Sequence, residues 1–376
     1  NTLNISIIRK LCVSGFNRVN RVNRINRINR MLSNISFENT IYSNEYPIEK
    51  CKNILKNDII SVLGYGPQGK AQSLILRDLD YPVILGLRDN GKSWDNAIED
   101  GWIPNKNLFE IKDACEQGTI IKYLLSDSAQ KTQWSIVNHF LTKNKTLYFS
   151  HGFSLHFNEY TNVTPPKDVN VIMIAPKCSG KTVRSHFLNG KTINSSYAIH
   201  QDVNNAYDKC MALGFSMGNK LMFETSIENE VLSDLTGERC ILMGMIQAAF
   251  SAQYKVLREN NHGPIESYNE TVEEALDSLY PIIKEKGMDW LYENCSKTAQ
   301  VGAIHWSKKF ERQLKPMIEE CYNSVKDGSE VESIINLDEH KLQEDLNKIK
   351  NQELWKVHRE MNKIKNSPGS WNGFLL

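Results

Sequence analysis

Residues 59–78 read IISVLGYGPQGKAQSLILRD, which combines an apolar run, a glycine-rich turn and a segment of helical composition. The turn places Gly64, Gly66 and Gly69 in a GxGxxG pattern directly after the apolar run. In a βαβ unit such glycines permit a tight turn, a close approach of backbone to pyrophosphate, and close helix–strand packing. The helix N-terminus then offers N–H donors to the anion. The stretch predicts a nucleotide-binding loop, with a plain glycine-rich turn as the alternative.

Short apolar runs recur from here to about Ser226, separated by spacers of helix length. The runs cover residues 59–63, 83–87, 119–125, 146–149, 171–175 and 221–223. Continuous apolar runs of this kind are typical of parallel strands that are buried on both faces. The pattern predicts a doubly wound α/β sheet, and we expect an N-terminal Rossmann-like domain over residues 45–226.

The pattern changes after about Ser226. Residues 234–257, 268–286 and 308–325 show helical periodicity and few β-branched runs. No repeat of 20–50 residues is evident, which argues against a solenoid. We expect an all-helical domain over residues 227–365, followed by a short tail at 366–376.

The first 44 residues differ from the rest in charge. They hold seven basic side chains and one acid, Glu38, which leaves a net charge of −5 for residues 45–376 although the whole chain carries +1. Arginines recur every third residue from Arg18 to Arg30 between valines and isoleucines. An Arg-rich, acid-poor amphipathic segment is typical of a transit peptide, mitochondrial or plastid. The alternatives are an Asn-rich low-complexity tail or a basic arm that binds nucleic acid.

Composition excludes several protein classes. The apolar and charged contents, 40% and 24%, are ordinary for a globular protein and unlike those of collagen or a disordered chain. No unbroken apolar run approaches the ~20 residues that span a bilayer, so we expect no membrane partner. The eight cysteines are scattered without a CxxC pair, which favours reduced thiols over a zinc site.

The second apolar run bears on which dinucleotide would bind. An Asp or Glu at its end would suit the ribose hydroxyl of NAD, but this run ends in Arg88. Arg88, Lys92 and the Ser93 hydroxyl suit a 2′-phosphate, whose charge a guanidinium can grip. Asp89 is the one residue that argues against this assignment. The pattern favours NADPH.

Two acidic pairs at i,i+4 spacing stand in the helical half. Asp234 and Glu238 would share one helical face, as would Glu270 and Glu274. Carboxylate oxygens are the ligands that Mg²⁺ prefers, and two pairs could hold two ions. A solvated helix face is the other interpretation, and spacing alone does not decide between them.

Two residues follow directly on predicted strands. His151 comes just after the run at 146–149, and Lys177 just after the run at 171–175. Because ligands of open α/β sheets bind beyond the carboxyl ends of the strands, His151 could handle protons there and Lys177 could hold an anionic oxygen. A capped loop histidine and a surface lysine are the alternatives.

Taken together, these stretches resemble the ketol-acid reductoisomerase (acetohydroxy acid isomeroreductase) family, in its shorter fungal-type form with an organellar presequence. The resemblance covers roughly residues 45–360. The matching stretches are GYGPQGKAQSLILRD (64–78), ILGLRDNGKSW (84–94), LLSDSAQ (124–130), YFSHGFS (148–154), APKCSGKTVR (175–184), INSSYA (193–198), SDLTGER (233–239), YNETVEEALDSLYP (268–281) and CSKTAQVGA (295–303).

The resemblance implies a two-stage reaction with NADPH and two Mg²⁺ ions. An alkyl group of 2-acetolactate or 2-aceto-2-hydroxybutyrate migrates, and NADPH then reduces the product to a 2,3-dihydroxy acid of valine or isoleucine synthesis. By resemblance the metal ligands are Asp234, Glu238, Glu270 and Glu274; the catalytic residues are His151, Lys177 and Glu238; the substrate contact is Ser296; and the cofactor residues are Gly64, Tyr65, Gly66, Gln68, Gly69, Arg88, Ser93 and Ser126.

The resemblance also implies a homodimer or higher oligomer whose helical domains interlock. Glu270, Glu274 and Ser296 would then reach the site from the partner subunit. Three residues depart from the family pattern and put rate and affinity in question: Cys178 after the lysine, Met245 in the second half, and Lys70 after the glycine loop.

Two other functions fit parts of the sequence. A Rossmann reductase of 3-hydroxy acids would work without metal, and the four carboxylates argue against it. A non-catalytic protein could bind nucleic acid through the basic segment at residues 1–44. The rest of such a protein would be expected to be basic too, whereas residues 45–376 carry a net negative charge. The expected compartment is the mitochondrial matrix, with the plastid as the alternative.

Overall fold

The computed structural model describes residues 37–367. Most of the predicted transit peptide and most of the tail at 366–376 therefore lie outside the described residues. The first described elements are short: strand β1 spans Thr40–Tyr42, a 3₁₀ turn spans Ser43–Glu45, and helix α2 spans Ile48–Ile54.

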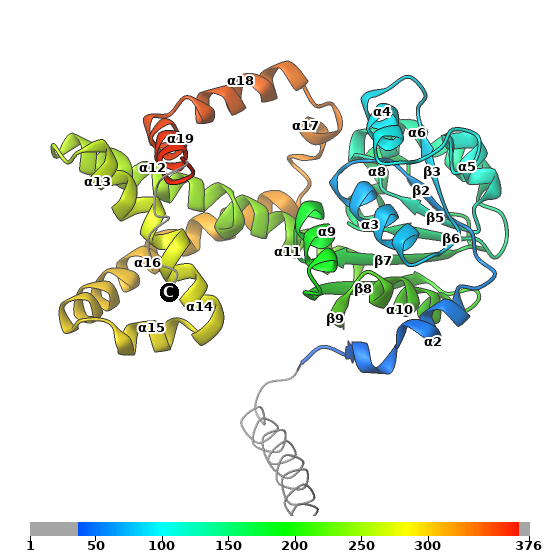
Figure 1. Ribbon diagram of the computed structural model, residues 1–376, viewed down its shortest axis with the longest axis horizontal. Coiled ribbons are helices and arrows are strands. Elements are labelled where there is room, and N and C mark those ends of the chain that lie inside the picture. The colour runs from blue at the N-terminus through cyan, green and yellow to red at the C-terminus, as the bar shows by residue number, and fades with distance from the viewer. Residues whose placement is uncertain (1–36, 368–376) are drawn as a thin grey trace, which may run out of the picture. The chain divides into compact units, whose positions relative to one another are not determined.

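A central sheet fills the first half of the chain (Figure 1). Its strands run side by side in the order β9-β8-β7-β6-β5-β2-β3-β4. The bounds are β2 Ile60–Leu63, β3 Val83–Leu87, β4 Leu108–Glu110, β5 Ile120–Tyr123, β6 Thr146–Phe149, β7 Asn170–Pro176, β8 Ile193–Gln201 and β9 Asn219–Glu224. All six predicted apolar runs form strands of this sheet, and the predicted Rossmann-like architecture is confirmed.

The pairings from β4 to β7 are all parallel. Ile60 of β2 lies opposite Val83 of β3 on one side and Ile120 of β5 on the other. The order reverses direction at β2, which places the end of this strand at a topological switch point. Ligands of open α/β sheets bind at such a point, so the fold places the glycine loop where a ligand is expected.

Strand β8 departs from the predicted parallel pattern. It pairs antiparallel with β7 and parallel with β9. Its sequence, INSSYAIHQ, is no apolar run, because buried Ser195 and Ser196 lie within it. The Ser195 hydroxyl donates to Asn219 Oδ1 at 2.7 Å, so a buried polar pair takes the place of an apolar contact.

Helices cover both faces of the sheet. They are α3 Pro67–Asp78, α4 Lys92–Glu99, α5 Ile111–Gln117, α6 Asp127–Phe140, α7 Phe153–His156, α8 Asn158–Thr161, α9 Gly180–Leu188 and α10 Ala206–Ser216. The main core cluster joins strands to α5 and α6 through residues such as Leu63, Tyr123, Trp134 and Phe149. Burial of these side chains stabilises the sheet by about 1.5–3 kcal/mol each.

The second half of the described chain is helical, as predicted. Its helices are α11 Ile227–Gly237, α12 Gly244–Glu259, α13 Pro264–Tyr268, α14 Tyr280–Lys286, α15 Met288–Asn294, α16 Lys297–Lys326, α17 Val331–Ile335, α18 Glu339–Lys350 and α19 Glu353–Lys365. Three π-helical turns interrupt them: η2 Glu238–Leu242, η3 Asn269–Glu273 and η4 Ala275–Leu279. Such turns are frequent at functional sites.

A second core cluster attaches helix α11 to the first half of the chain. Phe153 and Phe157 pack against Val231 and Leu235 of α11, with Val325, Val331 and Ile335 in the same cluster. A separate cluster joins α12, α13 and α19 around Phe250, Tyr254 and Leu354. The first of these clusters fixes the face of α11 that is directed toward the sheet.

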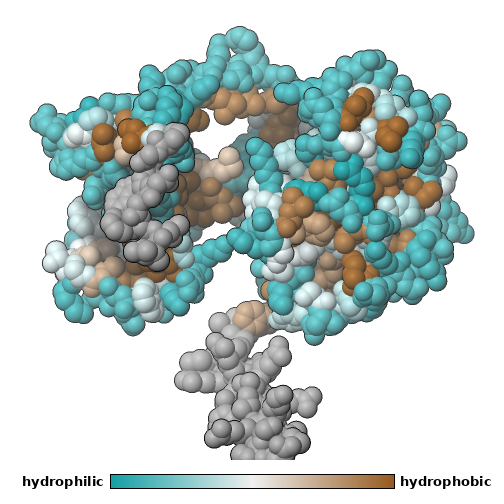
Figure 2. All heavy atoms as spheres, viewed as in Figure 1, coloured by the Kyte–Doolittle hydropathy of each residue, from teal (hydrophilic) through white to brown (hydrophobic). Residues whose placement is uncertain are grey.

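The helical half leaves large apolar side chains exposed. Met243 is 64% exposed, Val301 70% and Phe310 58%. Figure 2 shows apolar patches on this half of the chain. By length and hydropathy alone, Ile227–Glu259 is also the one helical stretch of the described residues that could cross a membrane. The stretch is not one continuous helix, because the backbone at Cys240 is non-helical.

Candidate active site

The glycine loop forms the floor of the site. Gly64 follows β2 with φ of +97°, a left-handed conformation that favours glycine. A Cβ at Gly64 would come within 2.5 Å of the Leu124 carbonyl oxygen, and a Cβ at Gly69 would collide with the carbonyl of Gly64. Gly66 precedes α3, and Pro67 occupies the first position of that helix. The loop therefore has the turn and the close packing that the sequence predicts.

A cavity of about 550 Å³ opens above this loop. Six of the predicted cofactor residues line it: Gly64, Tyr65, Gly66, Arg88, Ser93 and Ser126. Lys92 lines it as well. Gln68 and Gly69 are not among its lining residues. The Gln68 side chain instead donates from Nε2 to the Cys178 carbonyl oxygen at 3.2 Å. Two of the predicted cofactor residues thus support the loop.

Tyr65 is held by a buried network beside the cavity. Its hydroxyl donates to Asp100 Oδ2 at 2.8 Å and accepts from Trp102 Nε1 at 3.0 Å. Burial and the Asp100 hydrogen bond raise the pKa of Tyr65. Lys70, a departure from the family pattern, pairs with the same Asp100 carboxylate at 2.6 Å. The charge of Lys70 is therefore offset by a carboxylate.

Two glutamines of α3 connect the loop to the catalytic strands. Gln68 binds the backbone of Cys178, the residue after Lys177. Gln72 donates from Nε2 to the Ser150 hydroxyl at 2.8 Å, and Ser150 directly precedes His151. One helix thus holds both the nucleotide loop and the ends of β6 and β7 in place.

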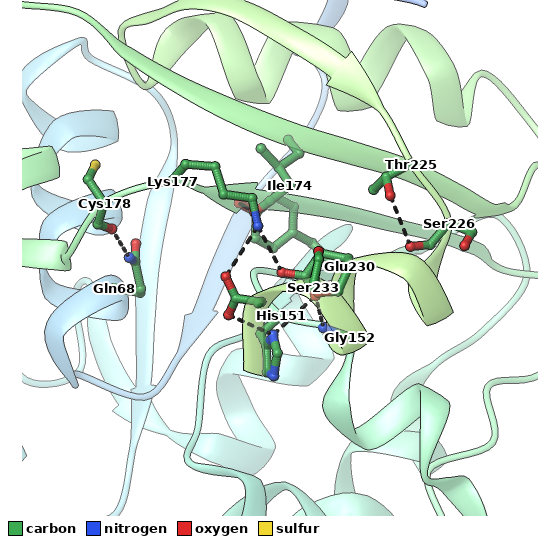
Figure 3. Close-up of polar contacts among 12 residues, drawn as sticks. Gln68, His151, Gly152, Ile174, Lys177, Cys178, Thr225, Ser226, Glu230 and Ser233 are labelled. Atoms are coloured by element: carbon green, nitrogen blue, oxygen red, sulfur yellow. Dashed lines mark hydrogen bonds and ion pairs between the residues drawn. The ribbon is translucent and has the colours of Figure 1, made fainter. Parts of the chain in front are cut away.

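Four polar side chains converge beyond the carboxyl ends of β6 and β7 (Figure 3). His151 and Lys177 follow these strands, and α11 brings Glu230 and Asp234 to face them. His151 Nδ1 lies 3.1 Å from Glu230 Oε2 and 3.5 Å from Asp234 Oδ2. Lys177 Nζ lies 3.3 Å from Glu230 Oε1 and 3.3 Å from Asp234 Oδ1. Each carboxylate contacts both cationic side chains.

Glu230 is the buried centre of this group. It is 2% exposed and also accepts a hydrogen bond from the Gly152 N–H at 3.0 Å. Burial alone would raise its pKa, but His151, Lys177 and the Gly152 amide lower it. Burial would lower the pKa of His151, and the hydrogen bond and charge of Glu230 raise it to about 9. The cluster therefore holds ionised groups of both signs.

His151, Glu230 and Asp234 also form a group that could hold a metal ion. One ligand atom of each lies within 4.8 Å of the others, and this is the one such group found among residues 37–367. Glu238 stands one turn after Asp234, at the start of η2. Burial, followed by the neighbouring Asp234 charge, raises the pKa of Glu238.

The remaining predicted ligands do not join this group. Glu270 and Glu274 are exposed on another part of the helical half, and Ser296 is exposed too. Ser296 caps α16 here, because its hydroxyl accepts from the Ala299 N–H at 3.2 Å. The structure brings His151, Lys177 and Asp234 together within one chain and leaves Glu270, Glu274 and Ser296 outside.

Sequence reasoning missed Glu230. The signal was present, since Glu230, Asp234 and Glu238 follow one another at intervals of four and share one helical face. Of the family departures, Cys178 packs partly buried against an apolar cluster around Ile75.

Comparisons with known proteins identify relatives of both halves of the chain. Residues 54–222 match the family described as "Acetohydroxy acid isomeroreductase, NADPH-binding domain", and residues 227–366 match "Ketol-acid reductoisomerase, C-terminal domain". The mitochondrial ketol-acid reductoisomerase of Neurospora crassa is 48% identical over 83% of this chain and 79% of its own length. This similarity supports the mitochondrial localisation that the basic segment at residues 1–44 predicts.

Two further similar proteins are named for NAD(+) or NADH. The ketol-acid reductoisomerase (NAD(+)) of Desulfosudis oleivorans is 45% identical over 85% of this chain and 92% of its own length. A solved NADH-preferring ketol-acid reductoisomerase from an uncultured archaeon has a TM-score of 0.78 at 27% identity, and the match covers 88% of this chain and all of that one. With a matched family description for each half and relatives of this identity, the chain belongs to the ketol-acid reductoisomerase family.

Proposed function

We propose that this chain converts 2-acetolactate or 2-aceto-2-hydroxybutyrate to the 2,3-dihydroxy-3-methyl acid of valine or isoleucine biosynthesis. An alkyl migration would precede a reduction by NADPH. The observation that carries the proposal is the convergence of His151, Lys177, Glu230 and Asp234 at the carboxyl end of the sheet. Helix α3 ties this cluster to the glycine loop, so hydride donor and acid–base groups would meet in one place.

The carboxylates are suited to two Mg²⁺ ions. Asp234 and Glu238 offer hard oxygen ligands one helical turn apart, next to the cationic pair of His151 and Lys177. Glu270 and Glu274 would complete the set from a partner subunit. Bound Mg²⁺ would acidify the substrate hydroxyl and polarise its carbonyl, and bound NADPH would supply the hydride.

The chain's own residues then have distinct roles. Lys177 Nζ would hold or protonate the oxygen that becomes anionic during migration and reduction. His151 would take or return the proton of the substrate hydroxyl at its imidazole. Glu230 contacts both cationic groups from a buried position and so sets their orientation. It is therefore a positioning residue.

We further propose NADPH as the reductant. Arg88, Lys92 and Ser93 line one region of the cavity and can bind a 2′-phosphate through charge and hydrogen bonds. Proteins named for NAD(+) and for NADP(+) both occur among the relatives, so the family alone leaves the preference open. The support for NADPH is the cationic pair at the end of β3.

The shared active site is also a proposal. The helical half exposes large apolar side chains, among them Met243, Val301, Phe310 and Met317, and Figure 2 shows apolar patches on it. Exposed apolar patches often mark protein–protein interfaces. Glu270 and Glu274 lie away from Asp234 in one chain, although both pairs are expected in one metal centre. An interlocked homodimer would cover the apolar side chains and bring the second carboxylate pair to the first.

The deciding test is oxidation of NADPH with 2-acetolactate, with and without Mg²⁺. We expect turnover only with the metal, and loss of turnover in Asp234→Asn. Glu228→Gln, on the exposed side of the same helix, is the matched control and should keep its activity. Equal NADPH consumption in the presence of a chelator would instead favour a reductase that needs no metal.

A further inference from the structure

An acidic residue from the far end of the chain lines the cofactor cavity. The cavity residues come from the sheet domain with one exception, Glu339, the first residue of α18. The sheet-domain residues extend from Gly64 to Gln133, whereas Glu339 follows two hundred residues later in the sequence. Its presence in the cavity wall therefore depends on tertiary packing.

The chain before Glu339 is anchored against the sheet domain. Val331 and Ile335 of α17 are buried in the same apolar cluster as Phe153 and Phe157. Helix α17 also packs against α6 and α8, and Ser128, Ala129, Thr132 and Gln133 of α6 line the cavity. This packing brings the end of α17 to the wall that α6 forms.

The chain at Glu339 is fixed by a helix cap. The Asp338 carboxylate accepts from the Lys341 N–H at 3.1 Å, which sets the start of α18. Asp338 is thereby engaged with its own helix, and Glu339 is the acid that the cavity wall includes. Packing of α17 and the Asp338 cap together hold Glu339 in the wall of the cavity.

The cavity is lined by side chains of both charges, the cationic Arg88 and Lys92 and the anionic Glu339. Within residues 37–367, neither Arg88 nor Lys92 forms an ion pair with a carboxylate, so both charges are available to a ligand. Asp89, the nearest acid in sequence, accepts a hydrogen bond from Asn90 and does not line the cavity. Glu339 therefore contributes a negative charge to a cavity that the cationic Arg88 and Lys92 also line.

We propose that Glu339 is a specificity-determining residue that weakens the preference for NADPH over NADH. This inference rests on the proposed dinucleotide function of the cavity. A 2′-phosphate brings about two negative charges that NADH lacks. A carboxylate in the wall therefore opposes NADPH more strongly than NADH, whose charges are those of the pyrophosphate at the glycine loop. Because Glu339 is exposed to solvent and its charge is screened, we expect an effect of about three- to tenfold in affinity.

The test compares Glu339→Gln with Glu344→Gln, which removes an exposed carboxylate from the same helix outside the cavity wall. NADPH and NADH are titrated separately into the full-length protein, and binding is followed by nucleotide fluorescence. We expect Glu339→Gln to lower the Kd for NADPH about three- to tenfold with little change for NADH. Added KCl should reduce the difference, since a charge effect is screened and a packing effect is not.

A second variant, Glu339→Lys, reverses the charge. It should bind NADPH more tightly than Glu339→Gln does if the charge is the cause. Equal changes for the two nucleotides, or no change in either variant, would overturn the inference. The outcome is separable from the proposed cofactor preference. If the wild type binds NADH more tightly but Glu339→Gln still gains affinity for NADPH alone, the NADPH proposal fails and the role of Glu339 stands.

Discussion

Glu230 Oε1 lies 3.3 Å from Lys177 Nζ, and the Glu230 side chain is only 1% exposed. The same carboxylate contacts His151 through its other oxygen. We expect Glu230→Gln to lower kcat about ten- to a hundredfold, because an amide keeps the shape but not the charge that orients both groups. Steady-state kinetics at saturating Mg²⁺ measure this effect.

The matched control for this substitution is Glu228→Gln, two residues away on the exposed side of α11. A structural role alone would reduce the yield or thermal stability of Glu230→Gln and leave kcat per folded molecule unchanged. A positioning role should instead alter the pH profile of kcat, since His151 loses the partner that raises its pKa.

Lys122 of β5 is a buried lysine outside the active site. It is 0% exposed, and its Nζ lies 4.0 Å from the centre of the Tyr148 ring and 3.8 Å from Met217 Sδ. Within the described residues no carboxylate pairs with it. Burial lowers its pKa to about 7. The cation–π contact offsets only part of the cost of desolvating the charge.

We expect Lys122→Met to stabilise the folded chain by a few kcal/mol at or below pH 7. Below about pH 7 the lysine is charged in both states, and the folded state carries the full cost of a buried charge. Between pH 7 and 10.5 the unfolded chain binds more protons, so the wild type gains stability as pH rises. The advantage of Lys122→Met should therefore shrink over this range.

Urea unfolding at pH 6.5 and 9.5 measures this difference, with the exposed Lys143→Met as the control. A gain in stability from Lys122→Met that is the same at both pH values would show that the effect comes from packing and not from the charge.

Subunit complementation tests the proposed sharing of the active site. A chain with Asp234→Asn and a chain with Glu270→Gln should each be inactive. In a heterodimer, one of the two sites would receive Asp234 and Glu270 from unmodified positions. Random mixing makes half of the dimers heterodimers, so activity should return to about a quarter of the wild-type value. Recovery requires unfolding and refolding together if the domains interlock, and no recovery would contradict a shared site.

Local sequence signals predicted the glycine loop and the ends of the strands. A strand, a turn and a helix within twenty residues suffice to place Gly64, Gly66 and Gly69. The close contacts that require glycine are made within the same strand–turn–helix unit or with the segment after the neighbouring strand. His151 and Lys177 were predictable for the same reason, since each directly follows an apolar strand.

The missed features depend on contacts between distant segments. Glu230 becomes central only because α11 packs against the ends of β6 and β7. Strand β8 lacks an apolar run, and the hydroxyl of its buried Ser195 is satisfied by Asn219 on β9. Glu339 reaches the cofactor cavity through the packing of α17, which no motif near the glycine loop reveals.

Gly180 offers a test of how helix α9 supports the cofactor loop. A Cβ at Gly180 would collide with the backbone of Pro67, which lies in the glycine loop and begins α3. We expect Gly180→Ala to lower stability by about 1–3 kcal/mol and to weaken dinucleotide binding, since either α9 or the loop must move. Gly302→Ala is the matched control, because a Cβ there meets nothing within 4 Å and lies in helix α16, where alanine is favoured over glycine. Thermal unfolding and nucleotide titration should separate the two variants; if Gly180→Ala binds the dinucleotide as tightly as Gly302→Ala does, close contact between α9 and the loop is not required for binding.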